Sequence, residues 1–142
     1  MGNQKKIGNN YEKKLCELLY TKGYWCHLFE YSKNGQPCDV IAIKGDVSML
    51  IDVKHCCKDL FTFDRIEPNQ RTCFNYAMNI CKIKRLGFVI YFKSEEKFKW
   101  LNFKVLKTLE EKGKKSIRKE DLPDFEFMLD TIIGEQNDKS NK

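Results

Sequence analysis

The stretch from residue 39 to residue 54 constrains the fold most, because two short apolar runs flank a glycine-containing turn. The runs 40–43 and 47–53 are rich in β-branched and large apolar residues, which suit a pleated strand. Gly45-Asp46 between them is a Gly-X pair, which closes two-residue hairpins with a positive φ at its first residue. We therefore predict a tight β-hairpin.

The register of this hairpin brings two carboxylates together. If Gly45-Asp46 is the loop, Lys44 faces Val47, and counting back along the ladder places Asp39 opposite Asp52. Residues directly opposite each other have Cβ atoms roughly 4.5–5.5 Å apart. Lys54 lies on the same face as Asp52, because side chains alternate faces along a strand. Carboxylates this close repel unless something neutralises them, and the usual candidate is a hard divalent cation.

Composition sets the outer bounds. The chain has 142 residues, 42% of them hydrophobic, which predicts one domain with a core of its own. The N-terminus is polar without a secretory leader, and no apolar run reaches membrane-spanning length, so we expect a cytoplasmic protein with no membrane partner. Seven cysteines, an odd number without a Cys-x-x-Cys pair, favour reduced thiols over disulfides or zinc.

The net charge of +6 leaves two interpretations open. Clusters of lysine and arginine could contact a phosphate backbone or could be ordinary solvated faces. Charge alone does not decide between them. These clusters lie at residues 5–6, 13–14, 82–85 and 112–119.

The order of predicted elements is helix, three strands, helix, strand, strand, with further helices near the C-terminus. This order predicts an α/β fold with a mixed sheet flanked by helices. Asn9 or Asn10 is the expected N-cap of the first helix, and Pro68 the expected first residue of the second. The predicted helices span residues 9–22, 68–84, 104–112 and, more weakly, 122–133; the predicted strands span 24–31, 40–43, 47–53, 86–92 and 98–103. We expect a loop at 55–67, one domain over 1–133 and a disordered tail over 134–142.

Each polar residue singled out has a purely structural alternative. A carboxylate in a buried strand is unfavourable unless it is paired or binds a metal, so Asp52 points to function. Lys54 could instead be the structural ion-pair partner of Asp52, and Asp39 could simply end a turn. Glu12 could be a first-turn acid that favours the helix dipole, and Gln70 an ordinary first-turn residue.

The two histidines form no metal-binding motif. His27 and His55 stand apart in the sequence, without the clustered pair that a histidine–metal nuclease needs. We expect both to be packing or surface residues.

Four short motifs in order resemble the restriction-endonuclease-like nucleases, which carry a Pro-Asp…(Asp/Glu)-x-Lys signature. Within that superfamily the chain is most similar to the Holliday-junction resolvases, both the archaeal type and the RecU type of Gram-positive bacteria and their phages. The resemblance covers roughly residues 7–103. The motifs are Gly8-x-x-x-Glu12, Pro37-x-Asp39, Asp52-x-Lys54 and Asn69-Gln70.

The resemblance implies a role for each matching residue. Asp39 and Asp52 would ligate Mg²⁺, for which Mn²⁺ could substitute, with Glu12 beside them as a further metal residue. Lys54 would orient or activate the attacking water, and Gln70 would support the site. Carboxylate-bound metal suits phosphodiester hydrolysis, which needs a nucleophilic water and stabilisation of charge on the phosphate.

The chain departs from the family pattern at three points. Cys38 separates the proline from Asp39, and Asp52 replaces the commoner glutamate. The stalk-like insertion of the RecU type is absent. Ser32 lies in the loop where archaeal relatives carry a functional serine, but its spacing to Asp39 matches poorly.

The resemblance implies a Mg²⁺-dependent endodeoxyribonuclease that cleaves branched DNA, such as four-way junctions. We expect a homodimer, since paired nicks on opposing strands follow from a two-fold axis. The apolar stretch 122–133 is one candidate for its interface. The alternatives are a restriction or repair nuclease of the same fold and a non-catalytic DNA-binding module.

Overall fold

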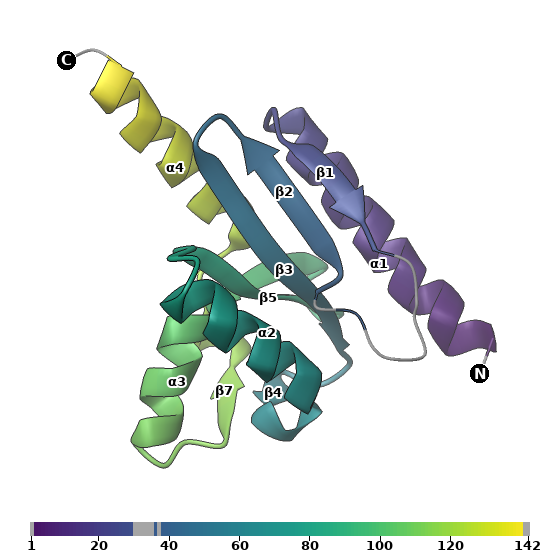
Figure 1. The fold of residues 1–142 in the computed structure, drawn as a ribbon. Coiled ribbons are helices and arrows are strands. Elements are labelled where there is room, and N and C mark those ends of the chain that lie inside the picture. The colour runs from purple at the N-terminus through teal and green to yellow at the C-terminus, as the bar shows by residue number, and fades with distance from the viewer. Residues whose placement is uncertain (1, 30–35, 37, 141–142) are drawn as a thin grey trace.

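A five-stranded mixed sheet forms the centre of the protein (Figure 1). The computed structural model describes residues 2–29, 36 and 38–140, with side chains described from Asn10 to Ile132 within those ranges. The strands lie in the order β1-β2-β3-β5-β6, and only β3 and β5 run parallel. Their bounds are β1 (Trp25–Leu28), β2 (Val40–Lys44), β3 (Val47–Cys56), β5 (Arg85–Phe92) and β6 (Lys97–Asn102).

The predicted hairpin register is confirmed. Lys44 pairs with Val47, and the antiparallel ladder continues to Val40 opposite Ile51. Gly45 has a φ of 58°, as the first residue of such a loop requires. The turn therefore fixes which residues meet at the far end of the hairpin, where Asp39 and Asp52 follow next.

Helices cover both faces of the sheet. They are α1 (Gly2–Thr21), α2 (Pro68–Asn79), α3 (Phe103–Glu111) and α4 (Phe125–Ser140). A small second sheet pairs β4 (Leu60–Thr62) with β7 (Ser116–Arg118), next to the short 3-10 helices η1 (Phe63–Arg65) and η2 (Lys119–Asp121). For the five-stranded sheet and its helices, the predicted order of helix, three strands, helix, strand, strand, with C-terminal helices after it, is confirmed; β4 and β7 are additional strands.

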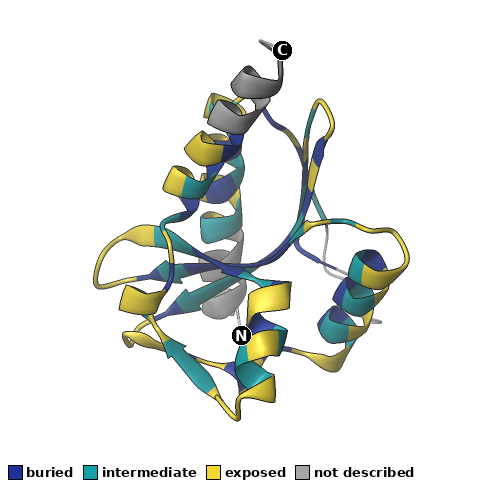
Figure 2. Cartoon of the chain, turned by 90° about the vertical axis from the view of Figure 1, so that its left-hand side faces the viewer, coloured by how far each residue is buried: buried dark blue, intermediate teal, exposed yellow. Residues whose placement is uncertain are grey.

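Two hydrophobic cores lie on opposite sides of the sheet, as expected for central strands that are apolar on both faces. Leu15 and Leu19 of α1 and Leu129 of α4 pack on one side. Phe74 of α2 and Leu106 of α3 pack on the other. Figure 2 shows α2 and α4 on opposite sides of the sheet.

The first helix begins earlier than predicted. Its backbone is helical from Gly2, so Asn9 and Asn10 are interior residues rather than N-caps, and Glu12 is not in the first turn. Gln4, Lys5 and Lys6 have good helix propensity, which carries the helix past the asparagines.

The second helix begins at Pro68 as predicted but ends earlier. Asn79 is its last residue, and Lys82 has a φ of 61°, so the predicted continuation to residue 84 is wrong. The stretch 55–67, predicted as a loop, contains the end of β3, β4 and η1. Strands of three residues that pair across a long sequence separation leave almost no periodicity to detect.

The C-terminal stretch packs inside its own chain. Phe125, Leu129 and Ile132 are buried in the same core as Leu15 and Leu19 of α1. These three side chains are therefore not available to a second copy, whereas Phe127 of the same stretch is 70% exposed, so an interface on this stretch stays a prediction. The helix also continues to Ser140, beyond residue 133, where we expected the tail to begin.

The sequence predicts reduced cysteines and no membrane-spanning segment. All seven cysteines lie within the described residues and are free thiols. No helix in the part of the chain that the structure describes is long and apolar enough to cross a membrane.

Candidate active site

Two buried aspartates meet where β2 begins and β3 passes it. The Asp39 amide donates to the Ile51 carbonyl at 3.0 Å, which extends the hairpin ladder one residue beyond β2. Asp39 is 7% exposed and Asp52 only 1%. The strand register thus brings together the two carboxyl groups that sequence spacing had placed opposite each other.

Both oxygens of Asp39 accept hydrogen bonds. Its Oδ2 accepts from the backbone amide of Val53 at 2.7 Å, across the hairpin. Its Oδ1 accepts from Nε2 of Gln36 at 2.6 Å. These two donors fix the orientation of the carboxyl group next to Asp52.

The two oxygens of Asp52 have different environments. Its Oδ1 accepts a hydrogen bond of 2.8 Å from Nε2 of Gln70. Its Oδ2 lies 3.1 Å from Nζ of Lys54, as an ion pair. That contact is close but misaligned, so this buried oxygen has no hydrogen-bond partner among the described residues. Each carboxylate oxygen has two lone pairs, so Oδ2, and also the three oxygens of the pair that accept one hydrogen bond each, can still bind a cation.

Gln70 is held in place by the start of α2. Its Oε1 accepts from the Glu67 backbone amide at 3.1 Å, as part of a capping box at the N-terminus of the helix. With its oxygen engaged there, the amide group turns its Nε2 toward Asp52. The next residue back, Asn69, donates to the Gln36 carbonyl at 3.2 Å and so ties the same helix to the loop before Asp39.

The electrostatics of the pair favour a positive partner. Burial, and then the negative charge of Asp39, raise the pKa of Asp52 well above its usual range, while Lys54 opposes the shift. Burial, and then the charge of Asp39, also raise the pKa of the half-buried Glu12 on α1 to about 7. Unneutralised negative charge is therefore unfavourable around Asp39, which is the condition that a bound divalent cation relieves.

These residues fit Mg²⁺. This ion keeps several waters and takes only one or two protein carboxylates, so Asp39 and Asp52 suffice. The buried Oδ2 of Asp52, which lacks a hydrogen bond, is suited to such a ligand role. Among the described residues no group of three His, Cys, Asp or Glu side chains is arranged to hold a metal ion, so Glu12 does not complete a three-residue cage.

The structure brings together four of the five predicted site residues, namely Asp39, Asp52, Lys54 and Gln70. Glu12 stands nearby on α1 and is affected by the charge of Asp39. Ser32 and Pro37 lie outside the described residues.

Both histidines pack against aromatic rings. His55 lies against Tyr11 at 5.4 Å between ring centroids, and His27 against Trp25 at 6.3 Å. Both are ring-packing residues, as the sequence predicted.

Gln36 belongs to none of the sequence motifs, and Asn69 has no role of its own in them. Gln36 precedes Asp39 by three residues, but its function depends on how the loop folds back. The only available signal was a polar amide close to a motif aspartate, and such residues are common in loops.

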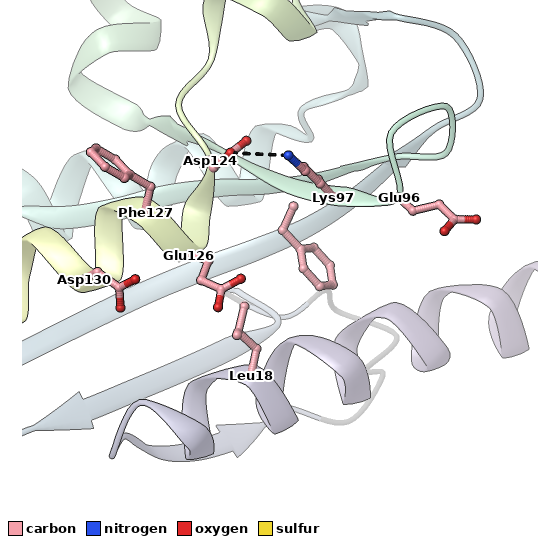
Figure 3. Close-up of a pocket in the computed structure, with 8 residues that line it drawn as sticks. Leu18, Glu96, Lys97, Asp124, Glu126, Phe127 and Asp130 are labelled. Atoms are coloured by element: carbon pink, nitrogen blue, oxygen red, sulfur yellow. Dashed lines mark ion pairs between the residues drawn. The ribbon is translucent and has the colours of Figure 1, made fainter.

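A hollow elsewhere on the protein has the wrong charge for DNA. It measures about 320 Å³ and lies between α1, β6 and α4. Figure 3 shows the labelled lining residues, which are Leu18, Glu96, Lys97, Asp124, Glu126, Phe127 and Asp130. Four of these seven are acidic, and a phosphate backbone is bound by cations.

Comparison with known proteins identifies the fold. No protein-family model and no curated protein matches the chain. Among solved structures, it is similar to Hjc, a Holliday junction resolvase from the archaeal hyperthermophile Archaeoglobus fulgidus. The TM-score is 0.59 at 16% sequence identity, covering 78% of this chain and 86% of that one. The predicted mixed α/β, nuclease-type fold is thereby confirmed.

Proposed function

We propose that the protein is a Mg²⁺-dependent endodeoxyribonuclease that cleaves branched DNA, with four-way junctions as its substrate. The observation that carries this proposal is the pair of buried, adjoining carboxylates with a lysine 3.1 Å from the second. The chain also shares its fold with a Holliday junction resolvase. Mn²⁺ is the expected substitute metal.

Each side chain has a distinct part in the proposed site. Asp39 and Asp52 would hold the metal, which when bound supplies charge stabilisation on the phosphate and lowers the pKa of water. Lys54, whose side chain is 14% exposed, would hold the attacking water or a phosphate oxygen through its ammonium protons. Gln70 is a positioning residue, because it acts by orienting Asp52. The oxygen of water would bond to phosphorus as the bond from phosphorus to one sugar oxygen breaks; the water gives up a proton and the leaving sugar oxygen takes one up, which leaves a phosphomonoester and a free hydroxyl.

Glu12 is proposed to act from the edge of the site. Because its pKa is raised to about 7, it can exist in both protonation states near neutral pH. Its charge would then add to that of Asp39 when the metal binds.

The test must also distinguish two other functions. A restriction or repair nuclease of the same fold would use the same residues on another DNA substrate, because substrate choice depends on surface shape. A non-catalytic DNA-binding module has no evident reason to retain a buried carboxylate pair, which is unfavourable without a partner. The enzyme is therefore the function that the geometry favours.

The test compares a labelled four-way junction with linear duplex of the same sequence, in Mg²⁺ and in EDTA. We expect paired nicks in the junction only, and only with Mg²⁺. Cutting of the duplex at a similar rate would favour the restriction or repair nuclease, and binding without any cutting would favour the non-catalytic module.

Asp52→Asn is the decisive variant. It removes a metal-binding charge but keeps the shape and the bond from Gln70, so we expect cleavage to fall at least about 100-fold while junction affinity changes little. Asp121→Asn, an exposed acid of η2, is the matched control and should cut normally. Equal cleavage by Asp52→Asn and the parent protein would show that the site is misassigned.

A further inference from the structure

Aromatic side chains line one face of β1, the strand at the edge of the five-stranded sheet (Figure 1). Trp25 is 57% exposed, His27 is exposed, and Phe29, just beyond the strand, is half-buried. Side chains alternate faces along a strand, so these three lie on one face, while Cys26 and Leu28 pack against the core on the other. We call Trp25, His27 and Phe29 the aromatic row.

The rings of the aromatic row contact one another in sequence. Those of Trp25 and His27 are nearly parallel, with 13° between their planes and 6.3 Å between their centroids. Phe29 meets His27 at 89°, edge to face, with 5.1 Å between centroids, and it packs against the core beneath α2. The row therefore presents two similarly oriented rings that are supported by a third.

The aromatic row leads to the candidate active site. The backbone amide of Phe29 donates to the Asp39 carbonyl at 2.9 Å, directly after the paired part of β1 and β2. Phe29 packs beneath α2, and Gln70 of that helix contacts Asp52, so the row and the carboxylate pair lie on the same face of the sheet. Trp25 lies four residues from Phe29, roughly 13 Å away at the rise of a strand.

The strands that carry this face offer no cation to a phosphate backbone. Across β2, Trp25 pairs with Ile43 and His27 pairs with Ile41. Lys44 lies on the opposite face, where its Nζ donates to a backbone carbonyl just after α1 at 2.8 Å. Within their described ranges, β1 and β2 thus place no lysine or arginine beside the row. Duplex DNA presents phosphates, which bind to cations, whereas an unpaired base presents a flat face that stacks on aromatic rings.

We propose that the aromatic row stacks unpaired bases of the DNA strand that enters the candidate active site. The occupant is a short single-stranded segment, because a length of roughly 13 Å holds about four bases at the roughly 3.4 Å spacing of stacked bases. A phosphate at the Phe29 end of this segment would lie next to Asp39 and Asp52. The bases would extend from there toward Trp25.

Stacking on the row would help the protein to distinguish branched from linear DNA. Taking a base out of a duplex requires unpairing and unstacking, and this is least unfavourable where the base is already unpaired. Bases at a branch point meet that condition more readily than bases inside a duplex. This role in substrate choice rests on the proposed function, whereas the binding of unpaired bases does not depend on cleavage.

Tryptophan fluorescence reports on the row directly. The chain has two tryptophans, and Trp100 is only 6% exposed, so a base that stacks on the surface would quench Trp25. We expect an oligothymidylate of about ten nucleotides, added in EDTA, to quench the emission saturably, and a duplex of the same length to quench it far less. Trp25→Phe should remove this quenching, because it replaces the exposed fluorophore with another stacking ring.

Affinities for the same labelled oligothymidylate, measured by fluorescence anisotropy in EDTA, test each ring. Trp25→Ala and His27→Ala should each weaken binding at least about fivefold, whereas Trp25→Phe should stay within about twofold of the parent protein. Phe127→Ala, at a residue of α4 that is 70% exposed, is the matched control and should bind normally. Circular dichroism should show that each variant is folded.

The outcomes separate this inference from the proposed function. Emission that the oligothymidylate leaves unchanged, or an equal loss of affinity in Phe127→Ala, overturns the inference. Weaker self-association of Trp25→Ala with normal oligothymidylate binding would make the row a protein contact and also overturns it. A parent protein that binds as expected but cuts no DNA supports the stacking row and contradicts only the proposed function. If the parent cuts junctions, Trp25→Ala should lower the ratio of junction to duplex cleavage at least about fivefold, and an unchanged ratio overturns the role in substrate choice.

Discussion

Lys54 is the residue whose two interpretations differ most sharply in their consequences. Its ammonium lies 3.1 Å from Asp52 Oδ2, which fits both a structural ion pair and a group that handles water or phosphate. If Lys54 is only a structural partner, removing it lowers the free energy of unfolding, because the charge of Asp52 is left buried and uncompensated. If Lys54 is catalytic, removing it lowers the cleavage rate, while a bound metal can still compensate the charge of Asp52.

We predict that Lys54→Ala lowers the junction cleavage rate at least about 100-fold in Mg²⁺, because no other described cation contacts Asp52. The free energy of unfolding in Mg²⁺ should fall by no more than about 1 kcal/mol, since the metal would neutralise the carboxylates. Urea unfolding and single-turnover cleavage measure the two quantities. Lys104→Ala, an exposed lysine of α3, is the control. A loss of stability with normal cleavage would identify Lys54 as the structural partner only.

Among the elements, β5 shows how closely the sheet is fitted to α3. Gly87 of β5 lies where a Cβ would collide with the Leu101 carbonyl oxygen and would come within 3.0 Å of the Phe103 backbone nitrogen. Those atoms belong to backbone at the end of β6 and the start of α3, so they cannot rotate away. The absence of a side chain at Gly87 lets β6 turn into α3 directly beside β5.

We therefore predict that Gly87→Ala destabilises the protein by more than about 3 kcal/mol, as overpacking against rigid backbone does. Gly113→Ala is the matched control, because open space surrounds that position and only its φ of 82° opposes alanine. That change should lower stability by about 1 kcal/mol. Thermal and urea unfolding of both variants measure the difference. Equal losses at the two positions would contradict the steric account.

The start of α4 is anchored to β6 by an ion pair. Asp124 Oδ1 lies 2.7 Å from Nζ of Lys99. The close contact with Lys99 lowers the pKa of Asp124 below its ordinary value of 3.8, although partial burial opposes the shift. A carboxyl whose pKa is lowered by folding contributes stability above its unfolded pKa and loses it as the pH falls through its folded pKa.

We expect Asp124→Asn to destabilise the protein by about 0.5–1 kcal/mol at pH 7, a small effect because Asp124 is 38% exposed. The difference in the free energy of unfolding between variant and parent should become smaller as the pH drops below 3.8. Chemical unfolding at a series of pH values checks this. A gap that stays constant down to the acid limit would mean that the charge of Asp124 contributes nothing.

Elements with local sequence signals were the ones that could be predicted. The hairpin was predictable because strand-forming runs and a Gly-X turn fix its register together. The start of α2 was predictable because Pro68 suits a first helical position. The start of α1 was not, since Asn9 and Asn10 are good caps that a longer helix overrides. The β4–β7 pair joins three-residue strands distant in sequence, so no local pattern reveals it.

At the scale of the whole molecule, the sequence predicts more of the candidate active site than of the surface around it. Asp39 and Asp52 meet because the register of a single hairpin fixes both positions, and that register can be predicted from the local sequence. Gln36 joins them only through the path of a loop, which the sequence does not specify. Phe125, Leu129 and Ile132 of α4 face their own core, and their spacing in the sequence would be the same if they faced a partner.

The proposed nuclease needs Asp39 and Asp52 to bind a divalent metal, and calorimetric titration with Mn²⁺ measures this binding without DNA. We predict saturable binding to the parent protein and to Asp121→Asn, and a loss of at least about tenfold in affinity for Asp52→Asn and for Asp39→Asn. Circular dichroism should show all four proteins folded. Metal binding that is undiminished in both site variants would contradict the account.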